Sequence, residues 1–216
     1  MRLHVKALLA LVAVAGLFVC APAGAAIIAQ ESFESYAVGS LSEQGSAGGG
    51  WAGGWNANSS EVVDVSSSPL SANGVTGGDK AVLIGWGNEN GRRLLTDSYS
   101  ISGDTPLYIS YLLRSTSDSP KGWIFNTTSN WDHRYVGVEE QSGAGDYIIS
   151  SSYKNKTLGG PELDNGGTVM VVAKITDASM DLWVNPVGEG TPDLHRDAGW
   201  SSLPGIGLSR RGGVSG

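Results

Sequence analysis

Tryptophans that stand beside short polar side chains are the residues of this chain best suited to bind a ligand. The 216 residues include seven Trp but only three Phe. In the alternating stretch 180–185, Trp183 shares one face of the expected strand with Asp181 and Asn185. An indole packs on the C–H face of a pyranose, and carboxylate and amide groups bond the sugar hydroxyls. The stretch therefore predicts a carbohydrate-binding site, and Trp131, in a polar loop, is a further candidate for it.

The same tryptophan has a second interpretation as part of the core. Both faces of a strand in a β-sandwich can be covered, one by the other sheet and one by a loop. Trp183 would then anchor the packing, and no sugar could reach its ring. The sandwich pattern favours this structural interpretation, and the binding interpretation names the best site if the protein has a binding face.

Charge and cysteine content exclude several other kinds of site. The formal net charge is −7, the sequence pI is about 4.9 and the sequence has no basic cluster. Nucleic-acid binding needs Lys and Arg to displace counterions from phosphates, so no nucleic-acid partner is expected. The single cysteine, Cys20, lies in the expected leader peptide. Cysteine nucleophiles, thiolate-bound zinc and redox chemistry are therefore not expected in the mature chain.

The N-terminus predicts a secretory signal peptide. A basic start precedes an unbroken apolar run, residues 7–19, and small residues follow it. This arrangement with an A-x-A exit is typical of such a peptide, with cleavage after Ala25 or Ala23. The apolar run is shorter than the ~20 residues that cross a bilayer. We therefore expect residues 1–25 to be removed, which leaves residues 26–216 as one secreted domain without a membrane span.

The elements that must position these residues are predicted to be β-strands. Apolar residues alternate with period two over 107–113, 169–175 and 180–184, and the last two runs indicate an antiparallel hairpin. Shorter β-rich runs are expected at 27–33, 61–65, 81–86, 93–99, 122–127, 134–139 and 146–152. Clusters of Ser, Gly, Asn, Asp and Pro separate the runs, as turns require. The pattern predicts an all-β, two-sheet antiparallel sandwich of the jelly-roll kind.

Three stretches of the sequence carry a family resemblance. They are the opening 31–39, the Trp-bearing glycine loop 48–55, and the late runs 171–175 and 181–186. Together they resemble the concanavalin A-like (laminin G-like) jelly-roll domains of secreted bacterial proteins. The resemblance covers about residues 27–212, and it implies a fold and at most a binding role, because this superfamily includes lectins, glucanases and domains of unknown role.

The glucanase branch of that superfamily implies a catalytic motif. It uses an E-x-D-x-x-E strand, whose two-residue period holds a nucleophile and an acid/base on one face. Residues 162–164 (Glu-Leu-Asp) match the first half, but glycines follow where the second glutamate should stand. Glu139 and Glu140 are adjacent, so they are expected to point to opposite faces of a strand. Because no paired-carboxylate strand is found, no catalytic residue is predicted.

Structural calcium is the remaining cofactor candidate, because jelly-roll domains like those resembled often hold Ca²⁺ through loop carboxylates and carbonyls. The available carboxylates are Glu31, Glu34, Asp64 and Asp79. No regular spacing singles them out, and acidic side chains also keep a domain soluble. No cofactor is therefore assigned.

Two functions follow from these observations. The leading prediction is a secreted, non-catalytic β-sandwich module that binds an extracellular polysaccharide or glycan, or serves as a structural surface domain. The alternative is a glycan hydrolase or lyase of the concanavalin A-like glucanase class. That enzyme would need two carboxylates that converge in a groove.

The C-terminal residues predict a domain that lacks its closing strand, with one alternative. The resembled domains close with another strand after the region 205–208, which would make this chain a fragment without its closing strand. The opening strand near 28–33 would then expose an apolar edge. In the alternative, residues 205–210 are the final strand and the last residues are a tail.

Overall fold

The computed structural model describes residues 27–57, 60–84, 89–115, 122–126, 134–141, 144–152, 155–163 and 166–210. The expected signal peptide and the candidate Trp131 lie outside this part of the chain. The described residues form antiparallel strands, together with one short 3-10 turn, η1 (Leu41–Glu43). The prediction of an all-β antiparallel sandwich is confirmed.

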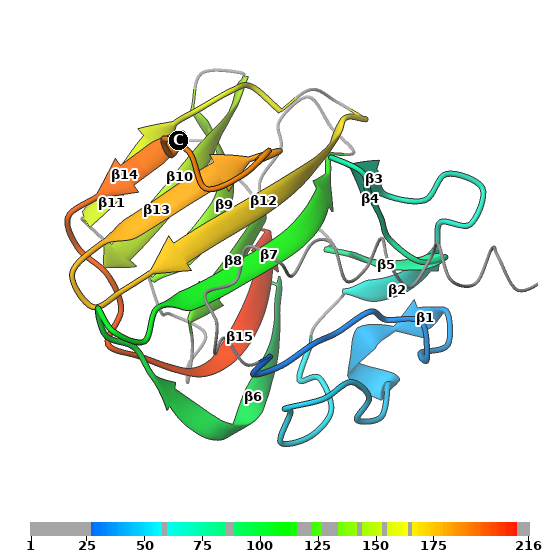
Figure 1. The fold of residues 1–216 in the computed structure, drawn as a ribbon. Helices are drawn as coiled ribbons and strands as arrows, with labels where there is room; N and C mark the ends of the chain where they lie inside the picture. Colours follow the sequence, from blue (N-terminus) through cyan, green and yellow to red (C-terminus); the bar gives the residue numbers. More distant parts are fainter. Residues whose placement is uncertain are drawn as a thin grey trace, which may run out of the picture.

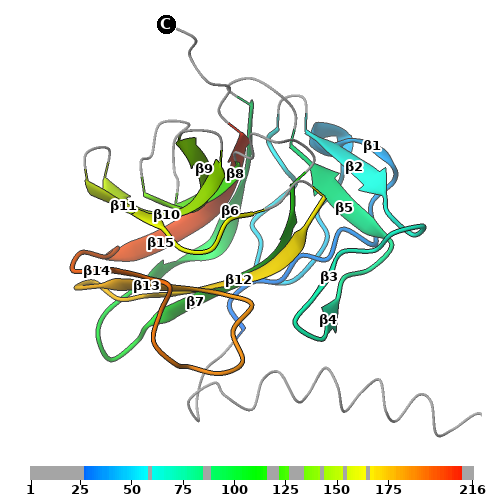
Figure 2. The ribbon, with the colours of Figure 1, turned by 90° about the horizontal axis from the view of Figure 1, so that it is seen from above.

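Two large sheets stack face to face, and smaller sheets lie beside them (Figures 1 and 2). The larger sheet has the order β11 (Asn155–Gly159), β10 (Ala144–Ser152), β9 (Tyr135–Gln141), β8 (Gly122–Asn126), β15 (Ser202–Arg210) and β6 (Glu89–Ser100). The four-stranded sheet has the order β14 (Leu194–Arg196), β13 (Met180–Val184), β12 (Thr168–Ile175) and β7 (Leu107–Arg114). The smaller sheets are β1 (Gly39–Ser40), β2 (Glu61–Asp64) and β5 (Lys80–Leu83), and the pair β3 (Ser71–Ala72) and β4 (Val75–Thr76).

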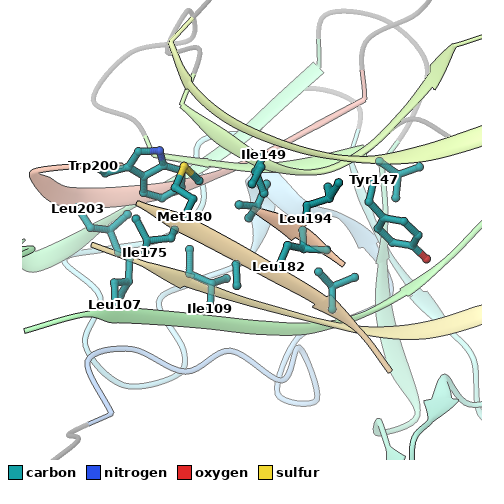
Figure 3. Close-up of a cluster of buried hydrophobic side chains, with 14 of the residues drawn as sticks. Leu107, Ile109, Tyr147, Ile149, Ile175, Met180, Leu182, Leu194, Trp200 and Leu203 are labelled. Atoms are coloured by element: carbon teal, nitrogen blue, oxygen red, sulfur yellow. The ribbon is translucent and has the colours of Figure 1, made fainter. Parts of the chain in front are cut away.

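The core lies between the two large sheets and follows from strand alternation. Every second residue of β12 is buried: Val169, Val171, Ala173 and Ile175. These side chains belong to one cluster with Tyr147 and Ile149 of β10. Figure 3 shows Trp200 beside Met180 at one end of the cluster and Tyr147 at the other end. The period-two pattern therefore fixes which face of each strand is buried.

The predicted hairpin is confirmed as β12 and β13. The two strands are antiparallel, with Ile175 opposite Met180. The N–H of Thr176 donates to the carbonyl of Ser179 at 2.9 Å, and its Oγ1 accepts from the N–H of Ser179 at 2.8 Å. These two bonds close the turn that the polar residues predicted.

The opening run differs from the prediction. Residues 27–33 are not a strand, and a single bridge joins Gln30 to Gly49. Phe33 has a left-handed φ of 62°, which interrupts extended backbone. The glycine loop instead lies alongside β6, and Trp51 forms a β-bridge with Leu95 of that strand. The predicted opening strand is therefore wrong, and the loop expected after it supplies pairing along β6.

A buried ion pair fastens this N-terminal segment to β6. Arg93 is 1% exposed, and its Nη1 donates to Oε2 of Glu31 at 2.5 Å and to the hydroxyl of Tyr36 at 2.9 Å. The guanidinium carbon lies 5.1 Å from the ring centroid of Trp51 and 6.0 Å from that of Trp55. These two loop tryptophans therefore contribute to packing around the buried charge.

The late residues 202–210 form β15, which pairs with β8 on one side and β6 on the other. Residues 205–210 belong to this strand, and the absence of a further closing strand stays a prediction. Among the described residues, no helix has the length and apolar character to cross a bilayer.

Candidate functional site

The candidate residues divide between the two outward faces of the sandwich. Trp183 lies on the outward face of the four-stranded sheet, opposite Val172 of the neighbouring strand. It is only 7% exposed, and its Nε1 donates to the carbonyl of Gly190 at 2.9 Å. The segment 186–190 therefore covers the indole, as the structural interpretation of this residue expects.

The two polar neighbours of Trp183 are also engaged with the protein. Oδ1 of Asp181 lies 2.6 Å from Nδ1 of His195. Asn185 has a left-handed φ of 50°, and its Oδ1 accepts from the N–H of Met170 at 2.8 Å. Trp183, Asp181 and Asn185 do not form an open platform in this arrangement.

A row of charged residues crosses the same face. Strand register places His195 opposite Asp181, Asp181 opposite Lys174, and Lys174 opposite Tyr108. Nε2 of His195 also lies 3.0 Å from Oδ1 of Asp197, and hydrogen bonds to the two aspartates raise the pKa of the imidazole above its ordinary value. The row therefore alternates charges of opposite sign, which stabilises a sheet surface.

Lys174 extends this row to the covering segment. Its Nζ lies 2.7 Å from Oε1 of Glu189 and 5.8 Å from the ring centroid of Tyr108. The hydrogen bond to Glu189 raises the pKa of the ammonium group. Lys174 thus joins the sheet to the segment that covers Trp183.

Strand register sets two acidic positions opposite each other in the six-stranded sheet. In the hairpin of β9 and β10, Asp146 is the register partner of Glu139. Tyr147 and Ile149 of β10 belong to the core, so alternation places Asp146 and its partner position on the outward face. Asp146 is partly exposed. Opposed residues of antiparallel strands have Cβ atoms about 4.5–5.5 Å apart, so these acids occupy neighbouring positions.

The positions beside this pair carry aromatic and apolar residue types. In the next row of the same face, Ile148, which is fully buried, stands opposite Gly137, and Gly137 stands opposite Trp123. The row after it sets Tyr135 opposite Phe125. Aromatic residues and acids in neighbouring rows are the combination that sugar recognition and glycosidic bond cleavage require.

This pair is not found by comparing acids along a single strand, because the register partner of Glu139 is on the next strand. Gln141 pairs with Ala144, so only residues 142–143, a Ser-Gly dipeptide, separate the strands. Counting outward from that dipeptide as a two-residue turn sets Glu139 opposite Asp146.

Three of the four carboxylates considered for calcium have other partners, and Oδ1 of Asp64 accepts from the N–H of Ser66 at 2.8 Å. Glu31 is held by Arg93, and Oε1 of Glu34 accepts from the N–H of Lys80 at 3.0 Å. Within the described ranges, no group of three or more His, Cys, Asp or Glu residues is arranged to hold a metal ion.

Comparison with known proteins gives only distant likenesses. No protein-family model matches the chain, and no curated protein matches it. A β-1,3-glucanase from Mycobacterium marinum aligns with a TM-score of 0.39 and 11% identity, over 85% of this chain and 78% of that one. A glycoside hydrolase family protein from Mycobacterium thermorestibile gives 0.38 and 8%, over 71% and 66%. LamA from Z. galactanivorans, in complex with laminaritriose and laminaritetraose, gives 0.35 and 11%, over 74% and 71%.

These comparisons correct the leading functional prediction. Two of the aligned structures are named as a glycoside hydrolase family protein and a β-1,3-glucanase, not as a non-catalytic module. The sequence-based reason against an enzyme also fails, because two acids become neighbours across strands. Of the family resemblance, the all-β antiparallel sandwich is the part that the structure shows, and the laminin G-like label is not confirmed.

Proposed function

We propose that the protein is a glycan hydrolase that uses Asp146 and Glu139 as its two carboxylic acids. The observation that carries the proposal is their register across β9 and β10, which sets two acids opposite each other on an outward sheet face. Like charges in directly opposed positions destabilise a sheet. Such a local conflict is typical of a functional site, where selection for stability is overridden.

The spacing of opposed positions fits one of the two ways in which glycosidases work. With Cβ atoms about 4.5–5.5 Å apart, an aspartate and a glutamate can bring their carboxyl groups to the separation of about 5–5.5 Å that retaining enzymes use. One carboxylate attacks the anomeric carbon while the other acid protonates the leaving oxygen, and the glycosidic bond breaks. Water then cleaves the glycosyl ester and returns a proton to the second acid.

The substrate class follows from the residue types around the acids and from the expected leader. Tyr135 and the aromatic residue types at positions 123 and 125 suit the C–H faces of pyranose rings. The N-terminal segment is typical of a secretory signal, which supports export and a polysaccharide substrate outside the cell. Laminarin is the first substrate to test, because one aligned structure contains laminari-oligosaccharides.

The test is release of reducing sugar from laminarin and other neutral glucans by residues 26–216. We expect Asp146→Asn and Glu139→Gln each to lower the rate by about 10²–10⁴-fold, the usual contribution of an acid or base. Asp177→Asn, an exposed acid in the β12–β13 turn, is the matched control and should keep the rate of the parent protein.

Two results would overturn the proposal. One is a wild-type protein, folded by circular dichroism, that releases no product from any glucan in the panel. The other is a folded Asp146→Asn variant with the full rate. Product that forms with inverted anomeric configuration, followed by NMR, would show that the acids act at the longer separation.

A further inference from the structure

Trp183 is a large aromatic residue on an outward sheet face, but very little of it reaches solvent. It is 7% exposed, and its contact with the covering segment is one hydrogen bond from Nε1 to the carbonyl of Gly190, 2.9 Å long. The catalytic proposal does not use this residue, which lies on the opposite sheet from Asp146. What covers Trp183, and how firmly, is therefore a separate question.

The covering segment, residues 186–190, is exposed at every position except Pro186, which is partly buried. Val187 is 101% exposed, and the side chain of Glu189 is 51% exposed. Gly188, with a φ of 156°, lies in the middle of the segment. An apolar side chain held entirely in water shows that the segment is not packed by hydrophobic burial.

Few contacts hold the covering segment over the indole. They are the bond from Trp183 to Gly190, the ion pair between Lys174 and Glu189, and a bond from the side chain of Asn73 to the carbonyl of Pro186. Ion pairs at a surface stabilise weakly and are screened by salt. Segments with few buried contacts open at low free energy, independently of global unfolding.

The residues near the covered indole are suited to a neutral sugar. Asp181 lies two residues before Trp183 on the same strand face, and Tyr108, 40% exposed, ends the neighbouring row. Glu189 and Asp197 add two more carboxylates near this face, against Lys174 and His195. Excess negative charge disfavours an acidic polysaccharide, whereas hydroxyl groups can donate to carboxylate oxygens.

We propose that residues 186–190 are a displaceable cover, and that their opening turns Trp183 and Asp181 into a second binding site for a neutral polysaccharide. The ion pair between Lys174 and Glu189 is the latch. This site lies on the face opposite the acids of β9 and β10, so it holds the polysaccharide without taking part in cleavage. It goes beyond the proposed hydrolase activity and does not depend on it.

The test follows the solvent access of Trp183 by hydroxyl-radical footprinting, with peptide mass spectrometry to read oxidation at that residue alone. We expect Glu189→Gln to raise the oxidation rate of Trp183 several-fold. Glu162→Gln, an exposed glutamate outside the segment, is the matched control and should leave the rate unchanged. An unchanged oxidation rate of Trp183 in Glu189→Gln would overturn the proposal that the ion pair between Lys174 and Glu189 holds the segment closed.

Binding is tested with laminarin as the probe on the Glu189→Gln variant. Laminarin should protect Trp183 from oxidation, and polygalacturonate, an acidic polysaccharide, should not. Protection by the acidic polysaccharide alone, or by neither, would overturn the proposal.

Two further variants separate this site from the catalytic one. The same protection of Trp183 is expected in a protein that also carries Asp146→Asn, since hydrolysis is not required. Trp183→Phe should weaken retention of the protein on insoluble β-glucan, at a melting temperature that shows the variant is folded. Equal retention by folded Trp183→Phe would overturn the site, while the activity assay of Asp146→Asn decides the hydrolase proposal separately.

Discussion

The two outward faces of this sandwich differ in the charges that neighbouring strands set opposite each other. On the four-stranded sheet, Asp181 stands opposite Lys174 on one side and His195 on the other. On the six-stranded sheet, Asp146 stands opposite Glu139. Opposite charges in register stabilise a sheet and like charges destabilise it, each by about 0.2–1 kcal/mol. The demands of folding therefore explain the first face, whereas the second needs another reason, and catalysis is the reason that we propose.

The largest effect is expected when the face of the six-stranded sheet is given the charge pattern of the four-stranded sheet. Asp146→Lys would set a cation opposite Glu139, as Lys174 stands opposite Asp181. We expect the hydrolysis rate to fall by 10²-fold or more, about the loss of one acid or base, while the free energy of unfolding rises. Reducing-sugar release and urea denaturation of the same preparation measure both quantities. A variant that keeps its activity would show that Asp146 has no role in the reaction.

The packing of the first face is tested by Trp183→Ala. Removing a buried aromatic side chain lowers the free energy of unfolding by about 3–5 kcal/mol, and Trp183 is 7% exposed. We expect the free energy of unfolding to fall by about 3 kcal/mol, the lower end of this range, since residues 186–190 can collapse into the cavity that the indole leaves. Urea denaturation measures the loss. An unchanged midpoint would mean that the indole contributes nothing to stability in the closed state.

The value of opposite charges on the first face is tested by Asp181→Asn. This change removes the carboxylate that faces both Lys174 and His195, so stability should fall by about 0.2–1 kcal/mol. The loss should shrink at 1 M NaCl, because salt screens exposed charges. Denaturation midpoints at low and high salt give the result, and a loss that is independent of salt would contradict the electrostatic account.

The smallest effect concerns the titration of His195. Hydrogen bonds to Asp181 and Asp197 raise the pKa of its imidazole above the ordinary value. The proton is therefore held more tightly in the folded protein, so this stabilisation is complete below about pH 6.5 and is lost as pH rises through the raised pKa. An NMR titration should place the pKa of His195 above 6.5 and return it toward that value in Asp181→Asn. A value at or below 6.5 in the parent protein would contradict the two contacts.

Local patterns predicted the strands that carry their own signal. The hairpin of β12 and β13 was predicted because alternation in each strand and the polar turn at 176–179 agree with each other. The opening run 27–33 was apolar enough for a strand, but Phe33 takes a left-handed φ of 62° and the glycine loop pairs with β6 instead. Tertiary pairing decided that region, and a single run does not contain that information.

The two candidate sites also depend on tertiary pairing that a single run of residues does not contain. Glu139 and Asp146 are seven residues apart, and only the register across residues 142–143 makes them neighbours. The residue types around Trp183 were predicted, but its cover depends on contacts from Lys174 and Asn73, which lie far from it in sequence. A sequence shows which residues share one face of a strand. Which residue lies opposite on the adjacent strand depends on turn length, and which residue covers the face depends on loops.

The most direct test of the account measures activity and stability together in Asp146→Asn. If Asp146 opposes Glu139 for the sake of catalysis, neutralising it should abolish hydrolysis of laminarin while the urea midpoint stays equal to, or rises above, that of the parent protein. Asp181→Asn, on the other face, provides the midpoint expected when a stabilising charge is lost. An Asp146→Asn variant that keeps its hydrolysis rate, or whose midpoint falls as far as that of Asp181→Asn, would contradict the account.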